Sequence, residues 1–199
     1  SGALGEQGLL NVSGHAPGYL YNAAQIPFWR ERTDEYLSLA FSTIAAVTPR
    51  EDFAAVEGTN NLVPHAFWNV VPMGLTMARC RDFLRQMLVM EDERHDRLLI
   101  APAIPRAWLA EGSEVSLSEA PTHYGRVSFR LTSQIESRRE VHVALRLDLR
   151  RAPRQVRVRL RLPGSERVRR VLVDGRESDG VEGEWIVLQG AGLGKREIG

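Results

Sequence analysis

The sequence contains a single cysteine, Cys80, and a single lysine, Lys195, among 199 residues. One cysteine excludes an intrachain disulfide and any metal site built on cysteine pairs. No apolar run approaches the ~20 residues that a membrane-spanning helix requires, so we expect no membrane partner. The first residues, SGALGEQGLL, lack the basic and apolar regions of a secretory signal peptide. The compartment, cytoplasmic or secreted and periplasmic in a bacterium, stays open.

The basic charge is almost entirely arginine, and its distribution is uneven. Residues 1–95 contain 7 Arg and 11 Asp or Glu, whereas the rest of the chain carries 19 Lys or Arg and 14 Asp or Glu. Most arginines of the second part alternate singly with apolar residues. This pattern is typical of the solvated face of a strand and not of a dense basic patch, so we expect no nucleic-acid partner.

The first half of the chain has helical periodicity. A short helix is predicted over residues 19–28, and a longer one over residues 33–47, where Thr33 or Asp34 is the N-cap. Residues 73–90 form the strongest helical pattern of the chain. Its apolar stripe consists of Met73, Met77, Cys80, Leu84, Met87 and Leu88.

From Leu98 the period changes from 3.6 to 2. Apolar residues alternate with polar ones around residues 127–131, 141–147 and 156–162, which predicts half-buried strands with one face in solvent. Asp174-Gly175 is a hairpin signal, with a return strand near residues 184–188. Short strands at this spacing are typical of an antiparallel β-sandwich.

These patterns predict an α+β chain with a helical segment over residues 1–95 and a β-sandwich over residues 96–199. A Gly-, Asn- and Pro-rich loop of about 20 residues separates the two longer helices, which is unusual inside a compact domain. We therefore expect the helices to belong to a larger helical assembly. Their apolar stripes should not all be covered within this chain.

Two motifs follow the last helix: the run from Leu98 to Trp108, LLIAPAIPRAW, and the strand from Thr122 to Ser128, THYGRVS. They resemble the C-terminal end of bacterial glycoside hydrolases built on an (α/α)6 barrel, with the layout of the α-L-rhamnosidase-like families. The resemblance extends over about residues 15–175. It implies that the helices are the last ones of such a barrel and that a C-terminal β-sandwich follows. Within these motifs, we expect Trp108 to anchor the join between the helical and strand parts, and His123 and Tyr124 to pack between the sandwich and the barrel.

The resemblance implies an enzyme that hydrolyses glycosidic bonds in an oligosaccharide or glycoside. The rest of the barrel would come from an earlier part of the same protein or from a second chain, and this chain alone would be inactive. Such hydrolysis uses two carboxylates. Only the base position of the family falls within these residues, and Glu57 is the candidate. The family motif places a carboxylate nearer to Met73, where this sequence has none.

Side chains suited to sugar binding surround Glu57 in the sequence. Amide and imidazole groups pair with hydroxyls, and indole offers a flat apolar face to a pyranose ring. A second Gly-rich segment brings a histidine and a tyrosine. The candidate substrate-binding residues are Asn60, Asn61, His65, Trp68, His15 and Tyr21.

The sequence lacks the other common motifs of metal, cofactor and nucleophile sites. The histidines lack metal-ligand spacing, and no phosphate-binding loop or nucleophile elbow is present, so we expect no metal and no cofactor. One alternative of a different class stays open: a non-catalytic module that binds carbohydrate or protein through its sandwich.

Overall fold

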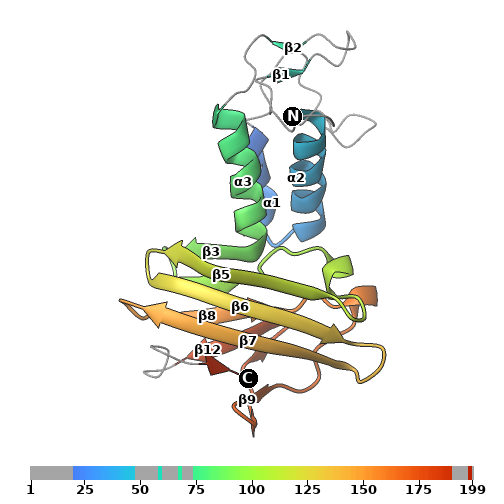
Figure 1. Ribbon diagram of the computed structural model, residues 1–199, viewed down its shortest axis with the longest axis vertical. Helices are drawn as coiled ribbons and strands as arrows, with labels where there is room; N and C mark the ends of the chain where they lie inside the picture. Colours follow the sequence, from blue (N-terminus) through green and yellow to red (C-terminus); the bar gives the residue numbers. More distant parts are fainter. Residues whose placement is uncertain (1–19, 48–57, 60–66, 69–73, 190–196, 199) are drawn as a thin grey trace. The chain divides into compact units, whose positions relative to one another are not determined.

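The computed structural model describes residues 20–47, 58–59, 67–68, 74–189 and 197–198. The chain divides into two compact units, Ser1–Arg85 and Gln86–Gly199 (Figure 1). The described part of the first unit is mainly helical, and the second unit consists mainly of strands. The chain is therefore of the α+β class, as the sequence predicts.

The helices are α1 (Leu20–Trp29), α2 (Thr33–Val47) and α3 (Gly74–Leu88), and a short hairpin pairs β1 (Gly58–Thr59) with β2 (Phe67–Trp68). The bounds of α2 are those predicted from its periodicity. Helix α3 is shorter than predicted at its C-terminal end, because the two residues after Leu88 already belong to a strand.

Aromatic side chains form the core of the helical unit. Phe28, Tyr36 and Phe83 are buried together with Ala24 and Ala40. The rings of Phe28 and Tyr36 meet edge to face at 5.2 Å, and the Tyr36 hydroxyl donates a hydrogen bond to the Phe83 carbonyl at 3.0 Å. Burial raises the pKa of Tyr36 above its ordinary value, so the hydroxyl remains a donor.

Helix α3 has apolar side chains on two faces, and in the described part of the chain only one of these faces is buried. Thr76, Phe83 and Met87 are buried, whereas Met77 and Leu84 of the predicted stripe are 46% and 43% exposed. Within the residues that the structure describes, the predicted stripe is thus covered only in part, and its coverage by a larger helical assembly stays a prediction. Other large apolar side chains of the helices are also exposed, namely Ile26, Trp29, Phe41 and Leu75.

The strand unit contains a five-stranded sheet of order β11-β12-β8-β4-β3. Its strands are β3 (Val89–Asp92), β4 (Arg97–Ile100), β8 (Gln155–Arg159), β11 (Val181–Glu182) and β12 (Trp185–Gln189). Strands β4 and β8 are parallel, whereas the other neighbours are antiparallel. Alternation of apolar residues marks strands but does not give their direction, so this parallel pair is not predicted by the sequence.

A four-stranded antiparallel sheet of order β13-β7-β6-β5 belongs to the same unit. Its strands are β5 (Glu114–Thr122), β6 (Gly125–Gln134), β7 (Glu140–Leu149) and β13 (Glu197–Ile198). The turn predicted at Asp174-Gly175 is confirmed, and it joins β9 (Leu172–Val173) to β10 (Arg176–Glu177). The predicted return strand near residues 184–188 is wrong, because β12 pairs with β8 and β11 instead.

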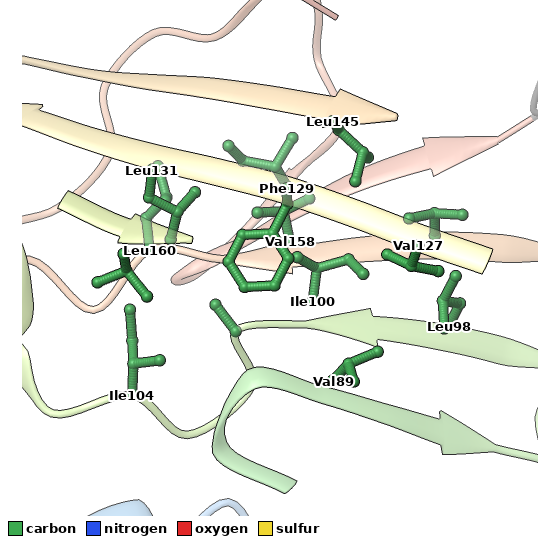
Figure 2. Packing of buried hydrophobic residues seen from close by; sticks show 14 of the residues in the cluster. Val89, Leu98, Ile100, Ile104, Val127, Phe129, Leu131, Leu145, Val158 and Leu160 are labelled. Carbon is green, nitrogen blue, oxygen red and sulfur yellow. The ribbon is translucent and has the colours of Figure 1, made fainter. Parts of the chain in front are cut away.

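Residues from both sheets share one hydrophobic core (Figure 2). Val127, Phe129 and Leu131 of β6 are buried as their alternation predicts. They meet Leu98 and Ile100 of β4 in the same cluster. A buried aromatic or aliphatic side chain of this kind contributes roughly 2–5 kcal/mol relative to alanine.

Helix α3 continues into β3 without a connecting loop. The carbonyls of Met87 and Leu88 accept hydrogen bonds from the backbone N–H groups of Ala103 and Ala101, at 3.3 and 2.7 Å. The segment after β4 therefore satisfies the last carbonyls of the helix. Because β3 belongs to the sheet, the strand unit begins before the boundary at residue 95 drawn from the sequence.

The arginines of β8 and the residues after it correct one expectation. The alternation predicts a solvated arginine face, yet the side chains of Arg157, Arg159 and Arg161 are only 11%, 10% and 2% exposed. Their charges are accommodated by partners on neighbouring segments. The prediction was wrong because a period of 2 assigns residues to two faces without showing whether the polar face is covered.

Candidate functional site

Most of the site residues predicted from the sequence lie outside the described residues. The candidate base Glu57 is one of them, and the candidate binding residues Asn60, Asn61, His65 and His15 are the others. Their roles stay predictions.

Trp68 lies in the short strand β2, where its Cα partner on β1 is Gly58. Gly58 follows Glu57 directly in the sequence. The pairing therefore brings Trp68 beside the chain segment that continues from Glu57. Within the residues that the structure describes, this register relates Trp68 to the residue that follows Glu57.

Tyr21 is a half-buried residue of α1. Its ring meets Phe83 edge to face at 5.2 Å, and the Arg79 guanidinium lies 4.7 Å from the ring centroid. Burial and the negative charge of Asp82 raise the pKa of Tyr21, although Arg79 opposes them. The contacts described for Tyr21 thus join it to α3.

Hydrogen bonds of arginine side chains connect the motif PAIPRAW to β8, the strand beside β4, and to the residues after β8. Arg159 Nη1 donates to the Pro102 carbonyl at 2.9 Å, and Arg161 Nη1 donates to the Ile104 carbonyl at 3.0 Å. In the reverse direction, Arg106 Nη1 donates to the Leu162 carbonyl at 2.9 Å. Three guanidinium groups thus fix the segment after β4 against the end of β8.

Glu184 is the carboxylate that these arginines contact. Its carboxylate accepts hydrogen bonds from Arg106 Nη2 at 2.5 Å and from Arg159 Nε at 3.0 Å, and Arg161 Nε lies 3.9 Å away. Partial burial acts to raise the pKa of Glu184. The hydrogen bonds and positive charges of Arg106 and Arg159 outweigh this effect and leave that pKa below its ordinary value.

Two of the arginines also stack on a tryptophan of β12. The guanidinium carbons of Arg157 and Arg159 lie 5.1 and 5.2 Å from the centroid of a Trp185 ring, within the range of cation–π contacts. Trp185 is directly opposite Arg159 in the register of β12 and β8. Arg157 Nη2 donates in addition to Glu182.

The motif THYGRVS forms a second connection, between turns of the two sheets. Tyr124 is buried, and its hydroxyl donates to Asp96 Oδ1 at 3.1 Å. Arg151 donates to the same oxygen at 2.7 Å. Burial, together with the hydrogen bond and charge of Asp96, raises the pKa of Tyr124 to about 12. Tyr124 thus packs within the strand unit, whereas His123 is exposed, and the packing of this motif against a barrel stays a prediction.

Two histidines lie in the same region, each beside a carboxylate. His95 Nδ1 is 2.7 Å from Asp92 Oδ2, and His123 Nε2 is 3.3 Å from Glu93 Oε1. Among the residues that the structure describes, no three His, Cys, Asp or Glu side chains are grouped to hold a metal ion.

None of the helices in the same residues has the length and apolarity needed to cross a membrane.

Sequence reasoning missed the cluster of arginines around Glu184. Its signal was present as two alternating patterns, VRVRLRL in β8 and the residues after it, and EGEW before β12. The arginines alternate along one face of a strand, whereas Glu182 ends β11 and Glu184 lies in the turn before β12. The pairing of β8 with β12, which aligns Trp185 with Arg159, was the missing information.

The described clusters hold segments together by ion pairs and hydrogen bonds, and within the described residues they do not form a catalytic pair of carboxylates. Comparison of the chain with protein-family models, with curated proteins and with solved structures finds no match.

Proposed function

We propose that this chain is the C-terminal part of a carbohydrate-active enzyme that hydrolyses glycosidic bonds. The helices would be the last ones of an (α/α)6-type barrel, and the two sheets would form its C-terminal β-sandwich. The remaining barrel helices, in the same protein or a second chain, would supply the general acid. The partner is an oligosaccharide or glycoside.

The exposed apolar side chains of the helices carry this proposal. Met77 and Leu84 lie seven residues apart on α3, which places them on one face, and both are more than two-fifths exposed. A helix that is apolar on two faces is typical of one packed between other helices. The second face of α3 is therefore suited to a neighbouring barrel helix.

The proposal assigns the role of base to Glu57, with Trp68 as the platform for the sugar ring. The support is the pairing of Gly58 with Trp68, which brings the continuation of Glu57 next to the indole-bearing strand. The aromatic side chains of the described strand unit, by contrast, are buried or half-buried, namely Trp108, Tyr124, Phe129 and Trp185. The sheets thus present no exposed aromatic ring to a sugar, which favours the helical unit as the site.

The test is Glu57→Gln in the protein assembled with its remaining helices, assayed on a panel of aryl glycosides. We expect kcat to fall at least 100-fold with little change in KM, because the base acts on the water and not on substrate binding. The matched control is Glu35→Gln, an exposed glutamate of α2 that pairs with Arg32.

Turnover unchanged by Glu57→Gln would remove Glu57 from the mechanism. Absence of turnover on every glycoside, combined with saturable binding of an oligosaccharide to the chain alone, would replace the hydrolase proposal by the non-catalytic binding module.

A further inference from the structure

Two Asp-Gly dipeptides lie close together in the sequence of the strand unit, at Asp174-Gly175 and Asp179-Gly180. Glycine has no side chain to keep its backbone nitrogen away from the carboxyl group of the aspartate before it. The nitrogen can therefore attack that carboxyl group, provided that the backbone rotates and that no hydrogen bond holds the nitrogen in place. The two dipeptides differ in both respects.

Asp174-Gly175 forms the exposed turn between β9 and β10. The two residues have φ angles of 51° and 75°, as in a two-residue type I′ hairpin. Both are exposed, and a Cβ added to Gly175 would meet nothing within 4 Å. Within the part of the chain that the structure describes, the Gly175 N–H and the Asp174 carboxylate form no hydrogen bond. This turn thus combines open space with a free backbone nitrogen.

The hairpin that carries this turn is short. Its ladder consists of Val173 opposite Arg176 and Leu172 opposite Glu177, and it forms a sheet of its own. The ion pair of Arg170 with Glu177 contributes little, because the two side chains are 65% and 66% exposed. An isolated two-stranded hairpin is marginally stable, so we expect the turn to open locally while the core of the strand unit stays folded.

Asp179-Gly180 has the same chemistry, but hydrogen bonds hold its backbone. The Gly180 N–H donates to Ser178 Oγ at 3.3 Å, and the Gly180 carbonyl accepts from the Val187 N–H of β12 at 2.7 Å. The Asp179 carbonyl accepts from the Val181 N–H at 2.8 Å. A Cβ added to Gly180 would lie 2.5 Å from the Val187 carbonyl oxygen, so the backbone is closely packed there. Rotation of this dipeptide therefore requires its release from β12.

We propose that Asp174 is a site of spontaneous isomerisation to isoaspartate. The Gly175 nitrogen forms a bond to the side-chain carbonyl carbon of Asp174, and the side-chain hydroxyl leaves as water with the amide proton. The resulting five-membered succinimide then takes up one water. Opening at the side-chain carbonyl restores aspartate, whereas opening at the main-chain carbonyl gives isoaspartate, whose backbone continues through Cβ. Nothing is oxidised or reduced, and water is the only co-reactant.

The product differs from aspartate in its backbone and in the position of its carboxylate. The additional main-chain carbon is incompatible with the two-residue turn, so the register of β9 with β10 is lost. The carboxylate becomes an exposed α-carboxylate, the group that protein isoaspartyl methyltransferases esterify. The reaction involves no residue of the helices, so it is independent of the proposed hydrolase and the two proposals can fail separately.

The test incubates the 199-residue chain at pH 6 and 37 °C and follows both dipeptides by peptide mapping, in which electron-transfer fragmentation distinguishes isoaspartate from aspartate. We expect isoaspartate to accumulate at Asp174 about tenfold faster than at Asp179 or more, because modification through a locally open state follows the population of that state. Equal rates at the two positions, or the absence of isoaspartate at Asp174, would overturn the proposal.

A pair of amide variants gives a second measurement. Asn-Gly cyclises by the same route with loss of ammonia, and asparagine is as well suited to a type I′ turn as aspartate, so the hairpin is retained. Asp174→Asn should deamidate about tenfold faster than Asp179→Asn or more, measured from the mass difference between amide and acid. Deamidation at equal rates would contradict the difference between the two turns.

A pair of glutamate variants localises the product. A glutamyl side chain would have to close a six-membered ring, which forms far more slowly. Asp174→Glu should therefore remove most of the methyl groups that an isoaspartyl methyltransferase transfers from S-adenosylmethionine to the aged chain, and Asp179→Glu should leave them unchanged. Methylation that persists in Asp174→Glu and disappears in Asp179→Glu would place the reactive site at the wrong dipeptide.

Discussion

The hydroxyl of Tyr124 donates a hydrogen bond to Asp96, and this bond joins the turn between β5 and β6 to the turn between β3 and β4. The two turns belong to different sheets, so the bond fastens one end of the shared core. Asp96 has a positive φ of 53° and accepts in addition from Arg151 and from the backbone of Arg154. The Asp96 carboxylate thus connects three segments: its own turn, the turn with Tyr124, and the segment with Arg151 and Arg154.

Tyr124→Phe should lower the free energy of unfolding by about 1 kcal/mol, because Asp96 keeps its other donors and the ring remains in the core. Chemical denaturation followed by circular dichroism measures this change. A loss above ~3 kcal/mol would contradict the assignment of a single hydrogen bond to the hydroxyl.

The same hydroxyl predicts a loss of stability in alkali. The pKa of Tyr124 is about 12 in the folded chain and 10 in the unfolded one, so the folded state favours the neutral form. Its contribution is fully present below pH 10 and is lost as the pH rises towards 12. Unfolding measured between pH 9 and pH 12 should show a smaller decline in Tyr124→Phe than in the parent.

Gly125→Ala should prevent the strand unit from folding stably. Gly125 has a φ of +140°, and a Cβ at this position would lie 2.3 Å from the Asp148 carbonyl oxygen. The loss should reach roughly 4 kcal/mol or more, since backbone atoms must move. Gly112→Ala is the control, because Gly112 has a φ of +72° but open space around it, and its cost should be about 1–2 kcal/mol.

Glu184→Gln should destabilise the strand unit by about 2 kcal/mol. The change leaves the Arg106 and Arg159 charges without their carboxylate, and partial exposure of Glu184 reduces the cost below that of a fully buried pair. Because the pKa of Glu184 is lowered on folding, its contribution is present above pH 4.5 and is lost as the pH falls below it. Glu114→Gln, whose partner Arg130 is exposed, should change stability by less than about 1 kcal/mol.

The two faces of α3 should respond differently to truncation. Phe83→Ala should cost about 3–5 kcal/mol because Phe83 is fully buried, whereas Leu84→Ala should cost less than about 1 kcal/mol in the chain alone. Urea unfolding of both variants gives the comparison. A large loss for Leu84→Ala would show that this face is already covered, which would weaken the proposed barrel.

Apolar periodicity was sufficient to predict the elements whose burial depends on a single neighbouring layer. The bounds of α2 and the buried face of β6 follow from apolar spacing, because one face of each meets a core. Arg159 and Arg161 were misjudged since their burial depends on carbonyls more than fifty residues away in the sequence. The spacing of nearby residues gives no information about partners so distant in the sequence. For the candidate site, the pairing of Gly58 with Trp68 was likewise beyond local spacing.

The direct passage from α3 to β3 has a consequence for the order in which the chain matures. The carbonyls of Met87 and Leu88 receive their hydrogen bonds from Ala103 and Ala101, which are synthesised later. These two carbonyls therefore lack their partners until residues 101–103 have been synthesised and the β3–β4 hairpin has formed. The last turn of α3 thus depends on residues of the strand unit for these hydrogen bonds.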